Sequence, residues 1–278
     1  MYNTGNFNSS LWNAPSRISS LLGSSEDIIF NGYGLQNAGI ITSEVLVEKV
    51  PTRDFDTTKI PNDHGRIINK DFFDVKTITL RGMIYKGTKE LYETLVDEFK
   101  KELSPQNKNL DIKRADGNYR RFVVTATTIN VKREKHSDIS SSPFEVVFQC
   151  LTPFGQSIGT TSSLFTPAVL SFSENIYNSG TAEAKPIWIM IVTSATAITD
   201  FTVTNDTTDE AIKVTNAIVA SDVIIVDGKE KTITLNGTEL DYNGSFPKLV
   251  AGSNSYTILF GGTAIAYSLT HKYTPFFL

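Results

Sequence analysis

The first half of the chain alternates apolar and polar residues over several short runs, which is the spacing of β-strands. Such runs cover residues 28–30, 40–50, 75–84 and 144–151, and a long stretch rich in β-branched residues begins at Asn118. Asn31-Gly32 and Asp116-Gly117 are hairpin-turn signals between runs. This pattern predicts a β-rich domain over residues 26–151.

One segment of this domain has helical spacing instead. Apolar residues recur at every fourth position, at Leu91, Leu95, Phe99 and Leu103. Gly87-Thr88 is expected to supply the N-cap, and Ser104-Pro105 is the expected end of the helix. The spacing predicts one helix packed on the sheet, and therefore an α+β domain.

Residues 51–71, PTRDFDTTKIPNDHGRIINKD, interrupt the alternation with two prolines, a glycine and many charges. An irregular segment of this length is unusual inside a compact domain. We expect a functional extension, either an extended loop or a strand pair that projects from the body.

The second half of the chain shows no helical spacing. Short apolar runs follow one another between residues 187 and 269, with Asp227-Gly228, Asn236-Gly237 and Asn243-Gly244 between them. Short strands with such turns predict a β-sandwich over residues 170–278. Residues 152–169, rich in Gly, Ser, Thr and Pro, are the expected linker, and the polar residues 1–25 are expected to form an N-terminal arm without its own core.

The composition of the 278-residue chain excludes several kinds of partner and of functional site. The net charge of −4 gives no overall attraction to nucleic acid or to anionic membranes. The one cysteine, Cys150, excludes an internal disulfide, and its place in an alternating run predicts a buried, unreactive thiol. The residues show neither a membrane-spanning run nor a signal peptide, and no spacing typical of a metal or cofactor site.

The pentapeptide at residues 155–159, GQSIG, matches the nucleophile elbow of serine hydrolases, with Ser157 as the nucleophile. That motif requires a helix directly after the serine, whereas β-branched residues and a proline follow here. An acid and then a histidine must also come later in the chain, and His271 is the only later histidine. We therefore interpret Ser157 as part of the linker and expect no catalysis.

Several motifs occur in an informative order. The second half contains YNSGTAEAKPIWIMI (177–191), DVIIVDGKEKTITLNGT (222–238) and FPKLVAGSNSYTILF (246–260). The first half contains FNGYGL (30–35), VKTITLRGMIY (75–85) and FEVVFQCLTPFG (144–155). In this order the chain resembles the distal tail proteins of long-tailed, siphovirus-type bacteriophages over residues 26–278, although its N-terminal arm is longer than the family pattern.

The resemblance implies a structural hub at the tail tip of the virion, assembled in the host cytoplasm. It implies a homohexameric ring, in which barrel-like N-terminal domains continue the tail tube around DNA in transit and galectin-like C-terminal sandwiches radiate outward. The implied partners are the tail tube protein, a tail-tip or tail-associated protein, and receptor-binding or baseplate proteins. From the residues we expect no cofactor, no metal and no membrane partner.

The segment 51–71 would correspond to an arm that embraces the neighbouring subunit. Each copy in a ring needs two different, complementary surfaces, and a projecting segment with scattered apolar residues can supply one of them. The interface residues expected in and beside this segment are Arg53, Phe55, Ile60, His64, Arg66, Ile67 and Phe72.

Two other functions stay open from the residues alone. A carbohydrate-binding module would stack exposed aromatic side chains on sugars, and its candidates are Trp188, Tyr242, Phe246 and Tyr256. Trp188 is also readily interpreted as a core residue, so Tyr242 and Phe246 are the expected glycan or partner contacts. A glycan hydrolase would need a catalytic carboxylate, and the candidate acid pairs all lie in expected loops.

Overall fold

The computed structural model describes residues 28–36, 39–47, 51, 53–59, 64, 66–132 and 141–278, without the side chains of residue 55 and residues 66–71. The chain divides after Pro153 into two compact units, and each unit has its own hydrophobic core. The predicted arm of residues 1–25 lies outside the described residues.

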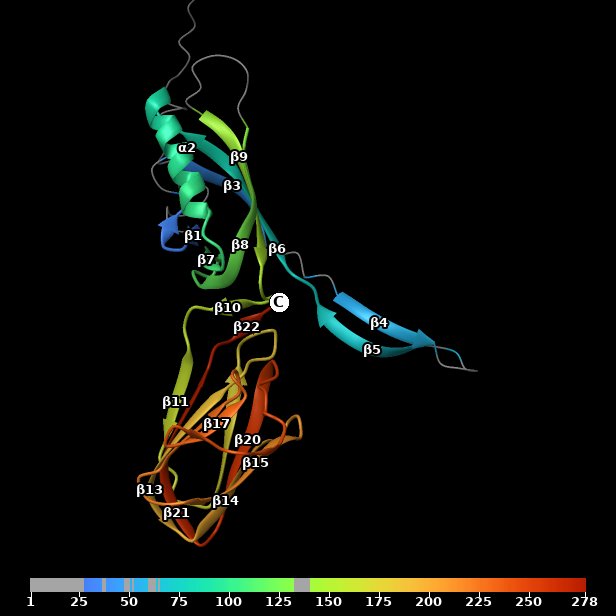
Figure 1. The fold of residues 1–278 in the computed structure, drawn as a ribbon, viewed down its shortest axis with the longest axis vertical. Coiled ribbons are helices and arrows are strands. Elements are labelled where there is room, and N and C mark those ends of the chain that lie inside the picture. Colours follow the sequence, from blue (N-terminus) through green and yellow to red (C-terminus); the bar gives the residue numbers. More distant parts are fainter. Residues whose placement is uncertain are drawn as a thin grey trace, which may run out of the picture. The chain divides into compact units, whose positions relative to one another are not determined.

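The first unit is an antiparallel sheet that packs against one helix, the only helix in the part of the chain that the structure describes (Figure 1). The strand order is β2-β1-β7-β8-β9-β6-β3. The strands are β1 (Ile28–Phe30), β2 (Tyr33–Gly34), β3 (Ile40–Leu46), β6 (Thr77–Tyr85), β7 (Lys108–Lys113), β8 (Tyr119–Val131) and β9 (Ser141–Cys150).

Alternation along the central strands gives the sheet one buried and one exposed face. On β6, Ile78, Leu80 and Ile84 are buried in the core, whereas Arg81 and Met83 between them are exposed. Strand β9 alternates in the same way, and its residue Phe144 packs edge-on against Phe99 of the helix at 5.0 Å between ring centroids. The helix therefore covers the buried face, as the alternation and the single amphipathic segment predicted.

The helix α2 spans Lys89–Leu103, and of the predicted Gly87-Thr88 pair Thr88 is the N-cap, whose hydroxyl accepts a hydrogen bond from the amide of Leu91. The predicted stripe was wrong at its first residue, because Leu91 is 55% exposed. Four residues rotate a helix about 40° past a full turn, so three such steps place Leu91 about 120° away from Leu103. The buried stripe is Tyr92, Leu95, Val96, Phe99 and Leu103.

The segment predicted as a projecting loop or strand pair is a strand pair. Strands β4 (Arg53–Lys59) and β5 (Arg66–Phe73) form an antiparallel hairpin with a β-bulge between Asp56 and Thr57. Figure 1 shows these two strands paired with each other, and they form a two-stranded sheet separate from the main one. None of the hairpin residues whose side chains the structure describes belongs to either core cluster.

The second unit is a sandwich of two antiparallel sheets, as predicted. Their strand orders are β11-β21-β13-β16-β17-β18 and β12-β20-β14-β15-β19. The strands are β11 (Thr161–Phe165), β12 (Ser171–Asn178), β13 (Ile187–Thr196), β14 (Ile198–Asn205), β15 (Glu210–Ile218), β16 (Val223–Asp227), β17 (Thr232–Leu235), β18 (Thr238–Glu239), β19 (Asn243–Gly244), β20 (Gly252–Gly261) and β21 (Ala264–Tyr273).

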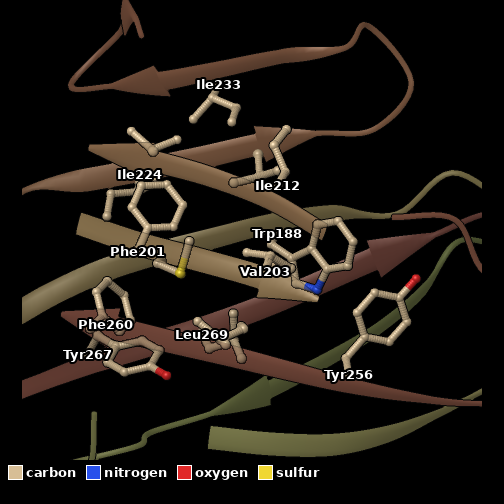
Figure 2. Packing of buried hydrophobic residues seen from close by; sticks show 14 of the residues in the cluster. Trp188, Phe201, Val203, Ile212, Ile224, Ile233, Tyr256, Phe260, Tyr267 and Leu269 are labelled. Carbon is tan, nitrogen blue, oxygen red and sulfur yellow. The ribbon is translucent and has the colours of Figure 1, made fainter. Parts of the chain in front are cut away.

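Side chains from both sheets fill the space between them (Figure 2). The indole of Trp188 on β13 packs against the ring of Tyr256 on β20, with 5.2 Å between the ring centroids. Asn236 and Gly237 both have positive φ, which makes the tight β17–β18 turn that Asn-Gly predicts.

Residues 152–169, the expected linker, include strands of the second unit. Strand β10 (Gly155–Ser157) pairs with β22 (Phe276–Phe277), and β11 pairs along its length with β21. The residues that lead into the sandwich therefore contribute an edge strand to it.

Candidate subunit interfaces

Besides the two-residue end strand β2, two longer strand edges of the N-terminal sheet have no partner strand among the described residues. Strand β3 is the last strand on its side of the sheet. Strand β8 pairs with β7 from Tyr119 to Val124, whereas its pairing with β9 runs from Val124 to Val131. The half of β8 beyond Val124 therefore presents an open side.

The two open edges border the same stretch of four strands, β3-β6-β9-β8. Leu46 at one edge aligns through Thr79 and Val147 with Thr128 at the other edge. The edges thus lie at the same level of the sheet and face in opposite directions. A row of unpaired N–H and C=O groups is a template for pairing with another strand.

These edges lack most of the features that prevent strand pairing. Proteins usually protect an exposed edge with charged side chains, especially lysine, or with proline. Strand β3 carries one charged residue, Glu44, and residues 125–131 of β8 carry none. Each edge strand has a β-bulge, between Thr42 and Glu44 and between Ala126 and Thr128. A bulge bends an edge, but it leaves the neighbouring backbone groups available.

All charged residues of this four-stranded stretch lie in one row on its exposed face. The guanidinium of Arg81 on β6 donates from Nε to Oε2 of Glu145 on β9, at 2.8 Å, and from Nη1 to Oε2 of Glu44 on β3, at 3.1 Å. These hydrogen bonds, donated to Glu145 and Glu44, raise the pKa of Arg81. Sequence reasoning missed this row, because its members come from strands far apart in the chain.

The β4–β5 hairpin is a second candidate interface. An isolated two-stranded hairpin is marginally stable in water, so a hairpin outside the core points to a partner. The Phe72 side chain is 51% exposed. The Arg53 guanidinium lies 5.0 Å from the centroid of the Phe73 ring, within the range of a cation–π contact.

The predicted interface residues map onto this hairpin as far as it is described. Arg53, Phe55, Arg66, Ile67 and Phe72 lie on its two strands, and the exposed His64 lies between them. Ile60 and the side chains of Phe55, Arg66 and Ile67 lie outside the described residues.

The structure separates the aromatic residues that were candidates for glycan stacking. Trp188 and Tyr256 are completely buried in the sandwich core, so neither can stack on a sugar. The Tyr256 hydroxyl donates to the carbonyl of Lys248 at 2.7 Å, and burial raises the pKa of this phenol. Tyr242 is 43% exposed, and its ring meets the half-buried Phe246 edge-on at 5.0 Å. Of the four candidate aromatic residues, Tyr242 and Phe246 therefore remain available as a glycan or partner contact.

The elbow motif does not have the geometry of a serine nucleophile. Gly155–Ser157 is an extended strand, the amide of Ser157 donates to the carbonyl of Pro275 at 3.0 Å, and the next element is the strand β11. His271 is buried inside the sandwich, where its Nδ1 lies 3.2 Å from Oε1 of Glu174 on the opposite sheet. The strand–turn–helix arrangement that exposes a catalytic serine is replaced here by two successive strands.

Within the described ranges, no group of three or more His, Cys, Asp or Glu side chains is placed to hold a metal ion. No helix there has the length and apolar character needed to cross a bilayer.

Comparisons with known proteins bear on both units. Residues 179–277 match the family described as siphovirus-type tail component, C-terminal domain. The comparison with curated proteins gave no match. Among solved structures, the Dit protein (gp 19.1) of SPP1, described as a hub of the adsorption apparatus in phages that infect Gram-positive bacteria, is similar over 91% of this chain and 99% of that chain, with a TM-score of 0.67 and 17% identity.

Two more distant similarities are with phage p2 baseplate structures in the activated conformation. With calcium, the TM-score is 0.41 at 9% identity, over 87% of this chain and 92% of that chain. With strontium, it is 0.39 at 8% identity, over 85% and 92% of the two chains. At these TM-scores the similarity does not establish a shared fold, whereas the match to the SPP1 protein does.

Proposed function

This chain carries the C-terminal domain of the siphovirus-type tail component family within a Dit-like fold, and from that premise we propose that it forms a ring-shaped hub at the tail tip. The family is one of structural tail components, in agreement with the prediction of a non-enzymatic protein. The observation that supports a ring is that β3 and the second half of β8 are open edges of the N-terminal sheet.

The two edges support a ring because they are different and complementary. Strands β3, β6, β9 and β8 are successively antiparallel, so β3 and β8 run in opposite directions. Pairing of β3 in one copy with residues 125–131 of β8 in the next would therefore continue the antiparallel alternation. Contacts between two different surfaces are heterologous, and they produce a closed ring when the rotation between copies closes.

A ring of six copies would close these strands into a barrel with a central channel. About 24 strands at a spacing of about 4.8 Å give a circumference of at least about 115 Å, and a diameter on the order of 40 Å between backbones. A layer of helices is about 10 Å thick, so helices inside the barrel would narrow the channel by about 20 Å. We therefore place α2 on the outer side and the exposed face of β3, β6 and β9 along the channel, where DNA would pass.

The hairpin and the sandwich take the remaining roles in this proposal. The β4–β5 hairpin clasps the neighbouring copy, which provides the partner that a two-stranded hairpin requires. The tail tube protein and a tail-tip protein bind the ring, and receptor-binding or baseplate proteins bind the sandwich, where Tyr242 and Phe246 are an exposed aromatic pair. The hub is a component of the virion, and its assembly takes place in the host cytoplasm.

Mass measurement in solution and electron microscopy test the ring directly. We expect the purified chain to have the mass of six copies and to show a central hole. Lysines at two exposed positions of the open β8 edge, Thr127→Lys and Thr128→Lys together, should give monomers because charged side chains block edge pairing. The matched control, Ser171→Lys with Ser173→Lys on the sandwich strand β12, should keep the ring. A monomeric native protein, or a ring that survives the β8 lysines, would contradict the proposal.

A further inference from the structure

The exposed face of the four-stranded stretch is almost free of charge. Strands β3, β6 and β9 each contain a single charged residue, Glu44, Arg81 and Glu145, and residues 125–131 of β8 contain none. The neighbouring row on one side consists of Ile41, Met83 and Pro143. On the other side, the row from Leu46 to Thr128 is also uncharged.

The two glutamates more than compensate the charge of the arginine. Arg81 lies between the two carboxylates in the pairing register, opposite Glu44 on one neighbouring strand and Glu145 on the other. Their side chains remain between 37% and 47% exposed. Exposed ion pairs contribute little to stability, so the fold alone does not explain why one arginine binds two glutamates.

The arrangement matters for a polyanion that moves along this face. A ring of six uncompensated arginines would bind phosphates and hold the duplex through the release of its counterions. With both glutamates present, each copy carries a net charge of −1 in this row, and the guanidinium already donates two hydrogen bonds to carboxylates. Phosphate oxygens would have to displace a carboxylate to bind Arg81.

We propose that Glu44 and Glu145 clamp Arg81 so that the channel wall does not bind DNA. Arg81 links three strands of the wall across the sheet, and the two glutamates remove the affinity for phosphate that such an arginine would otherwise give. This inference rests on the proposed ring, and it assigns the three residues to control of the contact between the wall and double-stranded DNA.

Removal of both carboxylates tests the clamp. The double variant Glu44→Gln with Glu145→Gln changes the net charge of the row from −1 to +1 in each copy. Binding of a fluorescent blunt-ended DNA duplex, measured by anisotropy at about 50 mM salt, should become at least about tenfold tighter than for the native ring and should weaken again at about 200 mM salt. Adding Arg81→Gln to the double variant should return binding to the native level.

The matched control makes the same charge change on the other side of the sheet. Glu90→Gln with Asp97→Asn alters two exposed carboxylates of α2 and should leave DNA binding within about twofold of the native ring. The single variants Glu44→Gln and Glu145→Gln should give intermediate binding, and they provide the test if the double variant does not fold.

The mass of each variant in solution and the central hole in electron micrographs are measured before DNA binding. These measurements separate the proposal of the ring from the proposal of the clamp. A native protein without a ring overturns both the hub and the clamp. A ring in which the Glu44/Glu145 variant binds DNA no more tightly than the α2 control overturns the clamp alone, as does tight binding that persists after Arg81→Gln.

Discussion

At the scale of single residues, Gly82 sets how closely β3 can approach β6. A Cβ at this position would collide with the backbone oxygen of Ile41 and would lie 2.7 Å from Cε1 of Phe144. The backbone oxygen cannot move without disturbing the β3–β6 pairing, so any side chain here overpacks the sheet. The absence of a Cβ thus permits the bulged edge strand to pair at all.

We therefore expect Gly82→Ala to lower the free energy of unfolding of the first unit by about 2 kcal/mol. Chemical denaturation followed by circular dichroism measures this change. Gly87→Ala is the matched control, because a Cβ there meets no atom within 4 Å, and its effect should stay within about 0.5 kcal/mol. Equal stability of the two variants would show that the edge strand can shift to make room.

Sequence reasoning at this scale succeeded where alternation alone decides burial. Cys150 follows the apolar face of β9, it is buried as predicted, and burial raises the pKa of its thiol to about 12. The partners of Arg81 could not be predicted, because Glu44 and Glu145 lie 37 and 64 positions away in the chain. Their contact depends on the register of three strands, which no local pattern encodes.

At the scale of elements, the β4–β5 hairpin contributes none of its described side chains to the core of the first unit. Its role in the proposed ring can therefore be tested without loss of the fold. Replacement of residues 53–73 by a short flexible linker should keep cooperative unfolding of the first unit and abolish the ring. A ring that persists without the hairpin would show that the sheet edges suffice.

A single substitution in the hairpin should weaken the ring without removing the hairpin, and mass measurement in solution checks this. Phe72→Asp places a charge at a position expected to be buried between copies. The subunit concentration needed for assembly should therefore rise at least about tenfold. Leu164→Asp on β11 is the matched control, because Leu164 is similarly exposed, and it should leave assembly unchanged.

Prediction of the elements followed the strength of their patterns. The runs from residue 187 onward became β13, β14 and their successors, because buried sandwich strands require alternating apolar residues. Strands β11 and β12 were not predicted: their sequences, TSSLF and SFSENIYN, are rich in Ser and Asn. Each is the outermost strand of its sheet, where polar residues are tolerated and the apolar pattern fades.

At the scale of the whole molecule, the two units differ in what they offer to other copies. The first unit has open, nearly uncharged edges along β3 and β8, and a hairpin whose described side chains lie outside the core. The second unit encloses a large core between its sheets, and both units carry their own clusters of completely buried side chains. The proposal assigns self-association to the first unit and docking of other tail proteins to the second. Composition and net charge could not predict this division, because it depends on which strand edges remain unpaired.

Cutting the chain between the units tests this division. The chain divides after Pro153, and every strand of the two sandwich sheets lies beyond that point, so a fragment of residues 154–278 keeps both sheets. We expect this fragment to unfold cooperatively and to remain monomeric, whereas residues 1–153 alone should still form the ring. Light scattering and thermal unfolding of the two fragments provide the measurement. If the sandwich fragment assembles and the N-terminal fragment does not, the ring is built by the second unit, and the open edges of the first must have another partner.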